Sequence, residues 1–328
     1  MKTEILRMLK ISDGYVSGQM LCDTFGVSRT AIWKVINQLK EEGYEIEAAS
    51  KKGYRMIKIP DILSKEEIES QIETKWAGRT TVYFDEVDST NTRAKFLAEE
   101  GAVHGTLVAA EQQNAGKGRR GHTWESPRGN GIWMTLILKP DILPQSASMV
   151  TLIAALAIAR SIKKSYGLDA KIKWPNDIVI NGKKVCGILT EMSSDIETIN
   201  YIIIGMGINA NITLFPEEIQ DKATSIFIEK GNEMIARSSL IAGIMKEIEI
   251  LLDTFFQTEN LAFIKKEYER YLVNIDKKVR ILEPKSEYTG TALGIGTDGD
   301  LIVKLEDGTI KEVMSGEVSV RGIYGYTD

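Results

Sequence analysis

Residues 20–39 read MLCDTFGVSRTAIWKVINQL and decide the fold of the N-terminal region. Apolar residues recur at helical spacing on both sides of Gly26, and again around Leu6, so three helices are predicted. Gly26 suits a tight turn, and the Ser28 hydroxyl can cap the helix that follows by accepting an unpaired backbone N–H. A helix, a glycine turn and a capped helix form the plan of a helix-turn-helix.

The polar side chains of the third predicted helix have the chemistry of a DNA-recognition surface. Arg29 and Lys34 can neutralise phosphates, and Thr30 and Asn37 can also reach base edges. Trp33 has two interpretations, a base contact or a cover for the edge of the core, and the second is at least as common for tryptophan.

A basic β-hairpin is predicted directly after this helix. Residues 44–57 contain two short strand-like stretches around Lys51-Lys52-Gly53, which is typical of a wing. The alternative is a three-helix protein-interaction module with a charged surface, which helix-turn-helix geometry alone does not exclude. The residues predicted to contact DNA are Ser17, Ser28, Arg29, Thr30, Trp33, Lys34, Asn37, Lys51 and Lys52.

The composition of the 328-residue chain favours two or three globular domains. Its 43% hydrophobic and 27% charged residues exclude disordered, collagen-like and disulfide-scaffold proteins. The net charge of −5 taken alone argues against nucleic acid. Residues 1–60, however, hold 10 Lys and Arg against 7 Asp and Glu, which leaves 31 against 39 for the rest. A small basic module therefore precedes an acidic body.

Several features predict a cytoplasmic protein. Cys22 and Cys186 lie in apolar contexts and are too few for a disulfide framework, which favours a reducing compartment. The first ten residues, MKTEILRMLK, interrupt their apolar residues with charges and so lack a signal-peptide core. The longest apolar run, residues 149–159, is far shorter than the ~20 residues of a membrane-spanning helix.

A linker around Pro60 is followed by alternating strand and helix signals, typical of an α+β domain built on a mixed sheet. From residue 277 on, short strand-like stretches alternate with glycine turns, which indicates a small all-β barrel. We therefore predict domains at residues 1–60, 61–272 and 273–328. The expected central strands are 82–87, 106–110, 132–138, 171–174, 178–180, 185–192 and 201–205, and the expected helices are 90–99, 146–166, 239–256 and 261–271.

The loop at residues 111–124, EQQNAGKGRRGHTW, is the most informative candidate site. Its three glycines let backbone N–H groups approach a ligand, while Lys117, Arg119 and Arg120 add cations, which suits a phosphate or carboxylate. It is not a Walker loop, because Glu111 stands where the first glycine is needed and no Ser or Thr follows the lysine. The alternative is a mobile basic surface loop.

Two further segments carry candidate chemistry. Residues 171–177, KIKWPND, precede residues 181–187, NGKKVCG, in which Lys184 can stand at a sheet margin and pair with an anion or assist acyl transfer. The Trp-Pro-Asn-Asp run is equally consistent with a simple turn. Residues 88–91, DSTN, lie at a strand-to-helix junction, where a helix cap explains them completely.

Other site classes are rejected. Residues 205–210, GMGINA, fit a dinucleotide-binding pattern after an apolar strand, but the next residues, NITLFP, do not begin the helix that would bind the phosphate. His104 and His122 lack the pattern of a structural metal site. No serine elbow or Cys-His pairing is evident, so any nucleophile is expected to come from a substrate.

Taken together, these motifs resemble the bifunctional biotin–protein ligase and biotin-operon repressor family over essentially the whole chain. Each motif is weak alone, but their shared order and spacing are highly specific. The resemblance implies a winged helix, a mixed-sheet catalytic domain like those of class II synthetases and biotinyl/lipoyl ligases, and an SH3-like C-terminal barrel. The motifs are the winged helix, DSTN (88–91), EQQ (111–113), GKGRRG (116–121), KWPND (173–177), KVCG (184–187), GMGIN (205–209) and Arg321.

The resemblance implies that biotin and Mg-ATP give biotinyl-5′-adenylate and pyrophosphate, after which a lysine of a biotin carrier domain attacks the activated acyl group. Preorganised cations are needed because the biotin carboxylate must approach an anionic α-phosphate. The implied catalytic residues are Lys184, Arg119 and Asp177, the last orienting the incoming amine. The implied biotin site is Ser89, Thr90, Asn91, Gln113, Lys117, Gly118, Arg119 and Lys184. The implied ATP and adenylate site is Gly116, Arg119, Arg120, Trp124 as a cover, Lys184, Asn209 at the adenine, and Arg321.

One departure concerns Lys117, where many relatives have arginine, so the charge is kept but bidentate contact is lost. The resemblance also implies several partners: the biotin carboxyl carrier protein of acetyl-CoA carboxylase and of other biotin-dependent enzymes, operator DNA, and a second copy of the chain once the adenylate is bound and the basic loop has ordered. No membrane partner is expected. The alternatives are a non-catalytic ligand-sensing transcription factor and a ligase for a related acyl cofactor such as lipoate.

Overall fold

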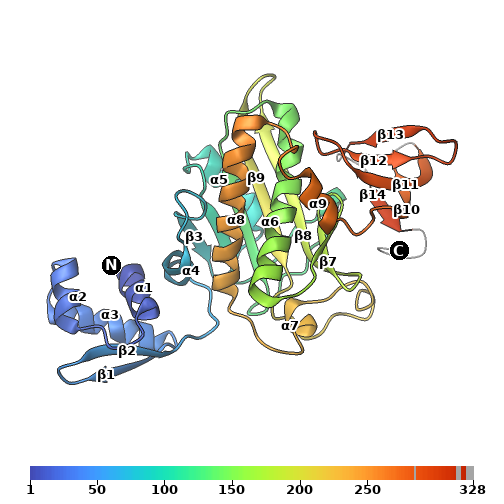
Figure 1. The fold of residues 1–328 in the computed structure, drawn as a ribbon. Helices are drawn as coiled ribbons and strands as arrows, with labels where there is room; N and C mark the ends of the chain where they lie inside the picture. Colours follow the sequence, from blue (N-terminus) through green and yellow to red (C-terminus); the bar gives the residue numbers. More distant parts are fainter. Residues whose placement is uncertain (284–285, 315–318, 323–328) are drawn as a thin grey trace. The chain divides into compact units, whose positions relative to one another are not determined.

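The structure is a computed structural model that describes residues 1–283, 286–314 and 319–322. The chain divides into two compact units, Met1–Ile72 and Glu73–Asp328, which follow one another along the colour scale of Figure 1. The domain boundaries expected at residues 60 and 272 remain predictions.

The first unit is a winged helix, as predicted. Gly26 has φ of 63°, the left-handed conformation that ends a helix, and the Ser28 hydroxyl accepts the N–H of Ala31 at 3.3 Å to cap the next helix. An apolar core that includes Leu6, Leu21 and Ile36 joins the three helices to the wing. The elements are α1 (Lys2–Ile11), α2 (Gly18–Phe25), α3 (Arg29–Glu41) and the antiparallel wing β1 (Glu45–Ala49) and β2 (Gly53–Lys58).

A fourth helix, α4 (Lys65–Gln71), which the sequence did not predict, packs on α1 within this unit. Its buried Glu67 pairs with Lys10 at 2.5 Å and accepts the hydroxyl of Tyr44 on its other carboxylate oxygen. Arg7 donates to the carbonyls of Glu69 and Ser70 at 2.6 and 3.2 Å, so a cation satisfies the C-terminal end of α4. Polar contacts therefore fix α4.

Replacing Glu67 with alanine is expected to destabilise this unit by about 3–5 kcal/mol, because it leaves the Lys10 ammonium buried without its carboxylate. Burial already lowers the pKa of Lys10, and the charge of Glu67 opposes that effect. Hydrogen exchange of the α1 and α4 amides in the full chain measures the change. Glu66→Ala is the control, since Glu66 lies 3.9 Å from the half-buried Lys2. Equal protection in both variants would contradict the prediction.

The second unit is built on a seven-stranded mixed sheet of order β3-β4-β5-β9-β8-β7-β6. Only β3 and β4 are parallel, and the other neighbours are antiparallel. The strands are β3 (Thr81–Phe84), β4 (Leu107–Ala110), β5 (Ile132–Leu138), β6 (Lys171–Lys173), β7 (Asp177–Ile180), β8 (Lys183–Ser194) and β9 (Ile199–Ile208). The predicted α+β class is confirmed.

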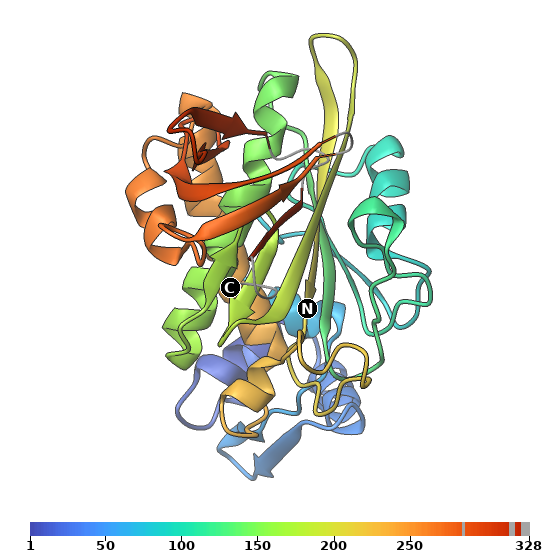
Figure 2. The same cartoon turned by 90° about the vertical axis from the view of Figure 1, so that its right-hand side faces the viewer.

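Helices cover both faces of this sheet. The long helices α6 (Met149–Tyr166) and α8 (Arg237–Thr258) lie side by side on one face. Helix α5 (Thr90–Glu99) covers the other face (Figures 1 and 2). The segment Pro144–Tyr166 is apolar enough to cross a membrane, but 78% of its most apolar window is buried, as in a core helix. The helices are α5 (Thr90–Glu99), α6 (Met149–Tyr166), α7 (Ile226–Glu229), α8 (Arg237–Thr258) and α9 (Lys265–Tyr271), with 3-10 turns at Arg119–Gly121 and Pro144–Ser148.

Strand β9 corrects one expectation. The predicted strand ended at Gly205, whereas β9 continues to Ile208, with Gly205 paired to Leu189 and Gly207 paired to Gly187. A Cβ at Gly205 would lie 2.1 Å from Asn91 Oδ1, so glycine here serves close packing rather than a turn. The pattern GMGINA is therefore largely strand, in agreement with the rejection of a dinucleotide-binding loop.

The C-terminal region forms a five-stranded antiparallel sheet of order β13-β12-β11-β10-β14. The turn after β11 contacts the rest of the second unit, because Trp174 Nε1 donates to the Gly299 carbonyl at 3.0 Å and Leu261 N donates to Thr297 O at 2.7 Å. The strands are β10 (Lys278–Leu282), β11 (Glu287–Ile295), β12 (Leu301–Lys304), β13 (Ile310–Val313) and β14 (Ser319–Gly322).

Candidate functional site

Backbone hydrogen bonds hold both ends of the glycine-rich loop after β4. The N–H groups of Asn114 and Ala115 donate to the carbonyls of Val87 and Asp88, both at 2.8 Å, and Trp124 N donates to Gly116 O at 2.9 Å. A Cβ at Gly116 would lie 2.3 Å from the Trp124 carbonyl, so only glycine allows this approach. The loop thus lies against the segment that begins α5.

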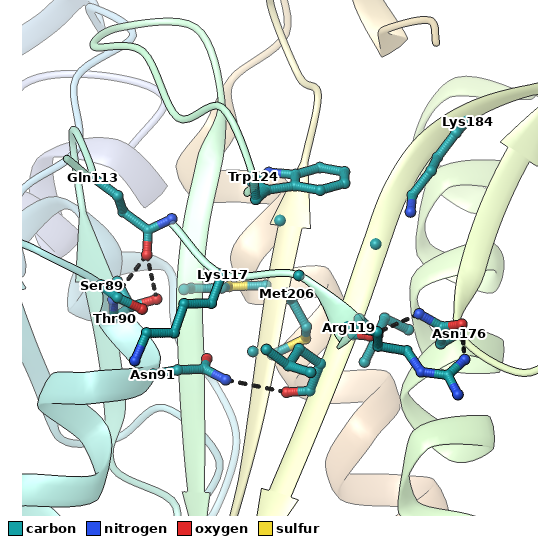
Figure 3. Close-up of a pocket in the computed structure, with 17 residues that line it drawn as sticks. Ser89, Thr90, Asn91, Gln113, Lys117, Arg119, Trp124, Asn176, Lys184 and Met206 are labelled. Carbon is teal, nitrogen blue, oxygen red and sulfur yellow. Dashed lines mark hydrogen bonds between the residues drawn. The ribbon is translucent and has the colours of Figure 1, made fainter. Parts of the chain in front are cut away.

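Beneath this loop is a pocket whose empty space, including its open mouth, is about 440 Å³. It lies over β8 and β9 and beside the start of α5 (Figure 3). All eight residues predicted for biotin line it, together with the predicted cover Trp124. These are Ser89, Thr90, Asn91, Gln113, Lys117, Gly118, Arg119, Trp124 and Lys184.

Four other predicted residues are described by the structure but are not among the residues that line the pocket. Gly116 packs under Trp124, and Arg120 is exposed in the loop with φ of 56°. Asp177 is in contact with Lys184. The amide of Asn209 is buried and donates to Thr224 O at 3.0 Å. Arg321 lies in β14, and its side chain is outside the described part of the chain.

One end of the pocket is polar and rigid. Gln113 Oε1 accepts the backbone N–H and the hydroxyl of Thr90 at 2.8 and 3.0 Å, and Gln113 Nε2 donates to Ser126 Oγ at 2.8 Å. Ser89 is the N-cap residue of α5, but its side chain makes no cap hydrogen bond. The alternative that helix capping explains this cluster completely is therefore wrong.

Asn91 is held from two sides at the same end. Its Oδ1 accepts the hydroxyl of Thr135 at 2.7 Å, and its Nδ2 donates to Glu191 at 2.8 Å. Lys117 extends toward Asn91 from the loop above (Figure 3). These partners leave this end pre-organised for a ligand with hydrogen-bonding groups.

The other end of the pocket is cationic. Arg119 Nη1 donates to Asn176 Oδ1 at 2.8 Å, and Lys184 Nζ lies 2.6 Å from Asp177 Oδ1. Burial lowers the pKa of Arg119, while the charge of Asp177 opposes this, and arginine stays protonated throughout. The three predicted catalytic residues therefore meet at one place.

Trp124 covers the sheet between these ends (Figure 3). A Cβ at Gly207 would lie 2.5 Å from Trp124 Nε1, and one at Gly187 would lie 2.9 Å from its Cζ3, so both glycines make room for the indole. Lys184 Nζ lies 5.0 Å from the ring centre, within cation–π range. The buried indole N–H has no hydrogen-bond partner among the described residues, which leaves it able to donate to a bound molecule.

Several lining residues escaped the sequence-based prediction as ligand contacts. Asn176, Gly187, Gly205, Met206 and Gly207 stood inside motifs that were singled out, but the bond of Asn176 to Arg119 depends on the fold. The others face the pocket because of strand pairing, which a single sequence does not reveal. The additional lining residues are Met134, Asn176, Gly187, Ile188, Leu189, Gly205, Met206 and Gly207.

The predicted DNA-contact residues lie in the first unit. Trp33 is 55% exposed, so it does not cover the core. The hydroxyls of Ser17 and Ser28 cap α2 and α3, which places both at helix N-termini. Asn37 is half-buried. The exposed members of the set are Ser17, Ser28, Arg29, Thr30, Trp33, Lys34, Lys51 and Lys52.

Comparisons with known proteins agree across the chain. Residues 83–209 match the biotin/lipoate A/B protein ligase family, residues 2–55 an HTH domain, and residues 275–321 the biotin protein ligase C terminal domain. The bifunctional ligase/repressor BirA of Bacillus subtilis is 42% identical over 93% of this chain and 94% of its own length. BirA of Escherichia coli is 30% identical over 93% and 92%.

The fold has matches among solved structures as well. The biotin protein ligase from Aquifex aeolicus in complex with biotin and ATP has a TM-score of 0.66 and 30% identity, covering 74% of this chain and 99% of that one. Three findings support one family: the winged helix, the pocket with one polar and one cationic end, and the relatives that align over nearly their whole length. The chain belongs to the bifunctional biotin–protein ligase and repressor family.

Proposed function

We propose that this protein forms biotinyl-5′-adenylate from biotin and ATP, transfers biotin to a lysine of a carrier protein, and represses transcription in response to biotin. The observation that carries the ligase proposal is a single pocket with a rigid polar end, a cationic end and an indole cover. Free buried thiols at Cys22 and Cys186 support a cytoplasmic location.

The polar end fits a ureido ring, which both donates and accepts hydrogen bonds. Ser89, Thr90, Asn91 and Gln113 offer hydroxyl, amide and backbone groups there, most of them already held in place by neighbours. The biotin carboxylate then extends toward Arg119 and Lys184. These cations offset its repulsion from the α-phosphate in a partly desolvated site, where such interactions are strong.

The adenylate fits beneath Trp124, whose unpaired indole N–H is available to it. No cluster of three or more His, Cys, Asp or Glu side chains suited to a metal occurs among the described residues. We therefore propose that Mg²⁺ arrives on the triphosphate of ATP, where it supplies charge neutralisation at the phosphates. We propose that Asp177, whose Oδ1 lies 2.6 Å from Lys184 Nζ, orients the incoming lysine amine.

The acceptor is proposed to be the biotin carboxyl carrier protein of acetyl-CoA carboxylase. A biotin–[acetyl-CoA-carboxylase] ligase of Paracoccus denitrificans, 40% identical over 124 residues, supports this choice. The test is pyrophosphate release and mass-spectrometric detection of biotinyl-adenylate from the purified chain with biotin and ATP. Lipoate is the competing substrate. Pyrophosphate release with lipoate but not with biotin would show that the chain is a lipoate ligase. No pyrophosphate release with either substrate would indicate a non-catalytic ligand sensor.

For regulation, we propose that the adenylate-bound chain pairs with a second copy and places two winged helices on a two-fold operator. The probe is duplex DNA that the chain selects from a random library in the presence of biotin and ATP. Affinity for this DNA and sedimentation are measured on one sample with and without both ligands. Tighter binding and faster sedimentation with both are expected, and indifference to them would reject the repressor role.

Replacing Gly207 with alanine is expected to raise the KM for ATP about 10- to 100-fold, because the new Cβ displaces the Trp124 indole that lies 2.5 Å from its position. Steady-state pyrophosphate release gives the KM, and tryptophan fluorescence reports the ring. The matched control is Gly243→Ala in α8, where a Cβ meets nothing closer than Ser161 at 4.0 Å. An unchanged KM in the Gly207 variant would contradict a covering role for Trp124.

A further inference from the structure

Arg237, the first residue of α8, is a buried cation outside the pocket. It is 1% exposed. Its Nη1 donates to Glu111 Oε1 at 2.8 Å and to the Gly131 carbonyl at 3.1 Å. Glu111 directly follows β4, and Gly131 directly precedes β5. One guanidinium nitrogen therefore contacts both ends of the 112–130 segment, which carries the glycine-rich loop.

The Arg237–Glu111 pair is costly to bury and is placed against the helix dipole. A cation in the first turn of a 22-residue helix meets a positive partial charge, and the carboxylate of Glu111 compensates for it. Tyr83 OH approaches the second carboxylate oxygen at 3.4 Å, and burial together with Glu111 raises the pKa of Tyr83 so that it remains a donor. Apolar side chains of similar volume often stabilise a core as well as a buried ion pair does, so directional contacts are what this pair adds.

Hydrogen bonds connect the segment that begins at Glu111 to the pocket. Glu111 N donates to Phe84 O at 3.0 Å, and two residues later Gln113 binds Thr90 and Ser126 through its side chain. Gln113 N also donates to Ser126 O at 3.2 Å, which joins the outgoing and returning parts of the loop. A change in the spacing of residues 111 and 131 is thereby passed to Gln113 and to the loop cations.

We infer that Arg237 is a positioning residue that fixes both ends of the loop and so sets how firmly Arg119 and Trp124 hold a bound adenylate. This inference rests on the proposed ligase function. Arg237 touches no substrate in this role, since it lies outside the pocket lining. Replacing Arg237 is therefore expected to change how well ordered the loop is and how long the adenylate intermediate is retained.

The test uses Arg237→Lys and Arg237→Met in the full chain, with Arg160→Lys as the matched control. Arg160 joins α6 to Glu267 and Glu247 and has no contact with the loop. The first readout is trypsin cleavage after Lys117, Arg119 and Arg120, compared with the thermal midpoint of the whole chain. The second is the rate of adenylate release after a single turnover, followed by stopped-flow tryptophan fluorescence.

Loop cleavage and adenylate release are expected to accelerate about 10- to 100-fold in Arg237→Met, since small displacements of binding groups have effects of this size. Arg237→Lys keeps the charge but not the fixed fork, so an intermediate effect is expected. Arg160→Lys is expected to change neither readout.

Wild-type rates of cleavage and release in both Arg237 variants would overturn the inference while leaving the ligase proposal intact. So would an acceleration that a lower thermal midpoint of the whole chain fully accounts for. If Arg237→Met does not fold, Arg237→Lys decides alone. Absence of adenylate in the wild type rejects the proposed function instead, and the trypsin readout still reports on the loop.

Discussion

Replacing Lys184 with alanine is expected to lower the rate of adenylate formation about 10²- to 10³-fold, the usual effect of removing one preorganised charge that stabilises a transition state. Lys184 Nζ lies 2.6 Å from Asp177 and 5.0 Å from the centre of the Trp124 ring. Its loss removes a cation from the place where two anionic substrates meet. It also leaves the mostly buried Asp177 carboxylate without this partner, which adds repulsion.

The control for this variant is Lys183→Ala on the same strand. Lys183 Nζ donates to the Gln220 carbonyl at 3.1 Å and is not part of the pocket lining. Single-turnover pyrophosphate release compares the two variants, and transfer of labelled biotin to a carrier domain is measured in parallel. Normal turnover by Lys184→Ala would remove Lys184 from the catalytic residues.

Replacing Arg119 with alanine is expected to have an effect of similar size, about 10²- to 10³-fold on kcat/KM for biotin, because the guanidinium serves the same developing charge. A double-mutant cycle with Asn176→Ala separates charge stabilisation by Arg119 from the positioning of Arg119 by Asn176. Asn176 Oδ1 accepts from Arg119 at 2.8 Å, and its Nδ2 donates to Ile188 O at 3.0 Å, so Asn176 holds Arg119 against the sheet.

We expect Asn176→Ala to cost about tenfold when Arg119 is present and little when Arg119 is already alanine, since contacting residues do not act additively. Additive effects of the two substitutions on kcat/KM would show that Asn176 acts independently of Arg119. A small effect of Arg119→Ala alone would contradict its assignment as a charge-stabilising residue.

Strong periodicity and shared motif order made much of the fold predictable. The helix at residues 90–99 and the strand at residues 132–138 have the predicted bounds, and the strand does so because its residues are nearly all apolar and are all buried. Helix α4 was missed because KEEIESQ carries little apolar pattern, and its contacts with Arg7 and Lys10 come from residues about 60 positions away. Such long-range polar contacts leave no local signal.

The sequence predicted the site residues that belong to recognisable motifs. It predicted less well the contacts that depend on packing between distant segments. All eight residues assigned to biotin line one pocket. Local reasoning alone favoured a helix cap for Ser89 and a strand end at Gly205. Gln113, which binds Thr90 beside Ser89, and Asn91, which packs on Gly205, are far from these positions in sequence, so only the fold reveals the contacts. The buried pair of Arg237 and Glu111, 126 positions apart, belongs to the same class.

The most direct test of the ligase account is transfer of labelled biotin. The purified chain is mixed with ATP, labelled biotin and a biotin carrier domain, with a second carrier whose acceptor lysine is replaced by arginine. We predict ATP-dependent covalent label on the lysine of the first carrier, none on the second, and a loss of at least about 10²-fold with Lys184→Ala. An unlabelled carrier in the presence of a folded, biotin-binding wild-type chain would contradict the account.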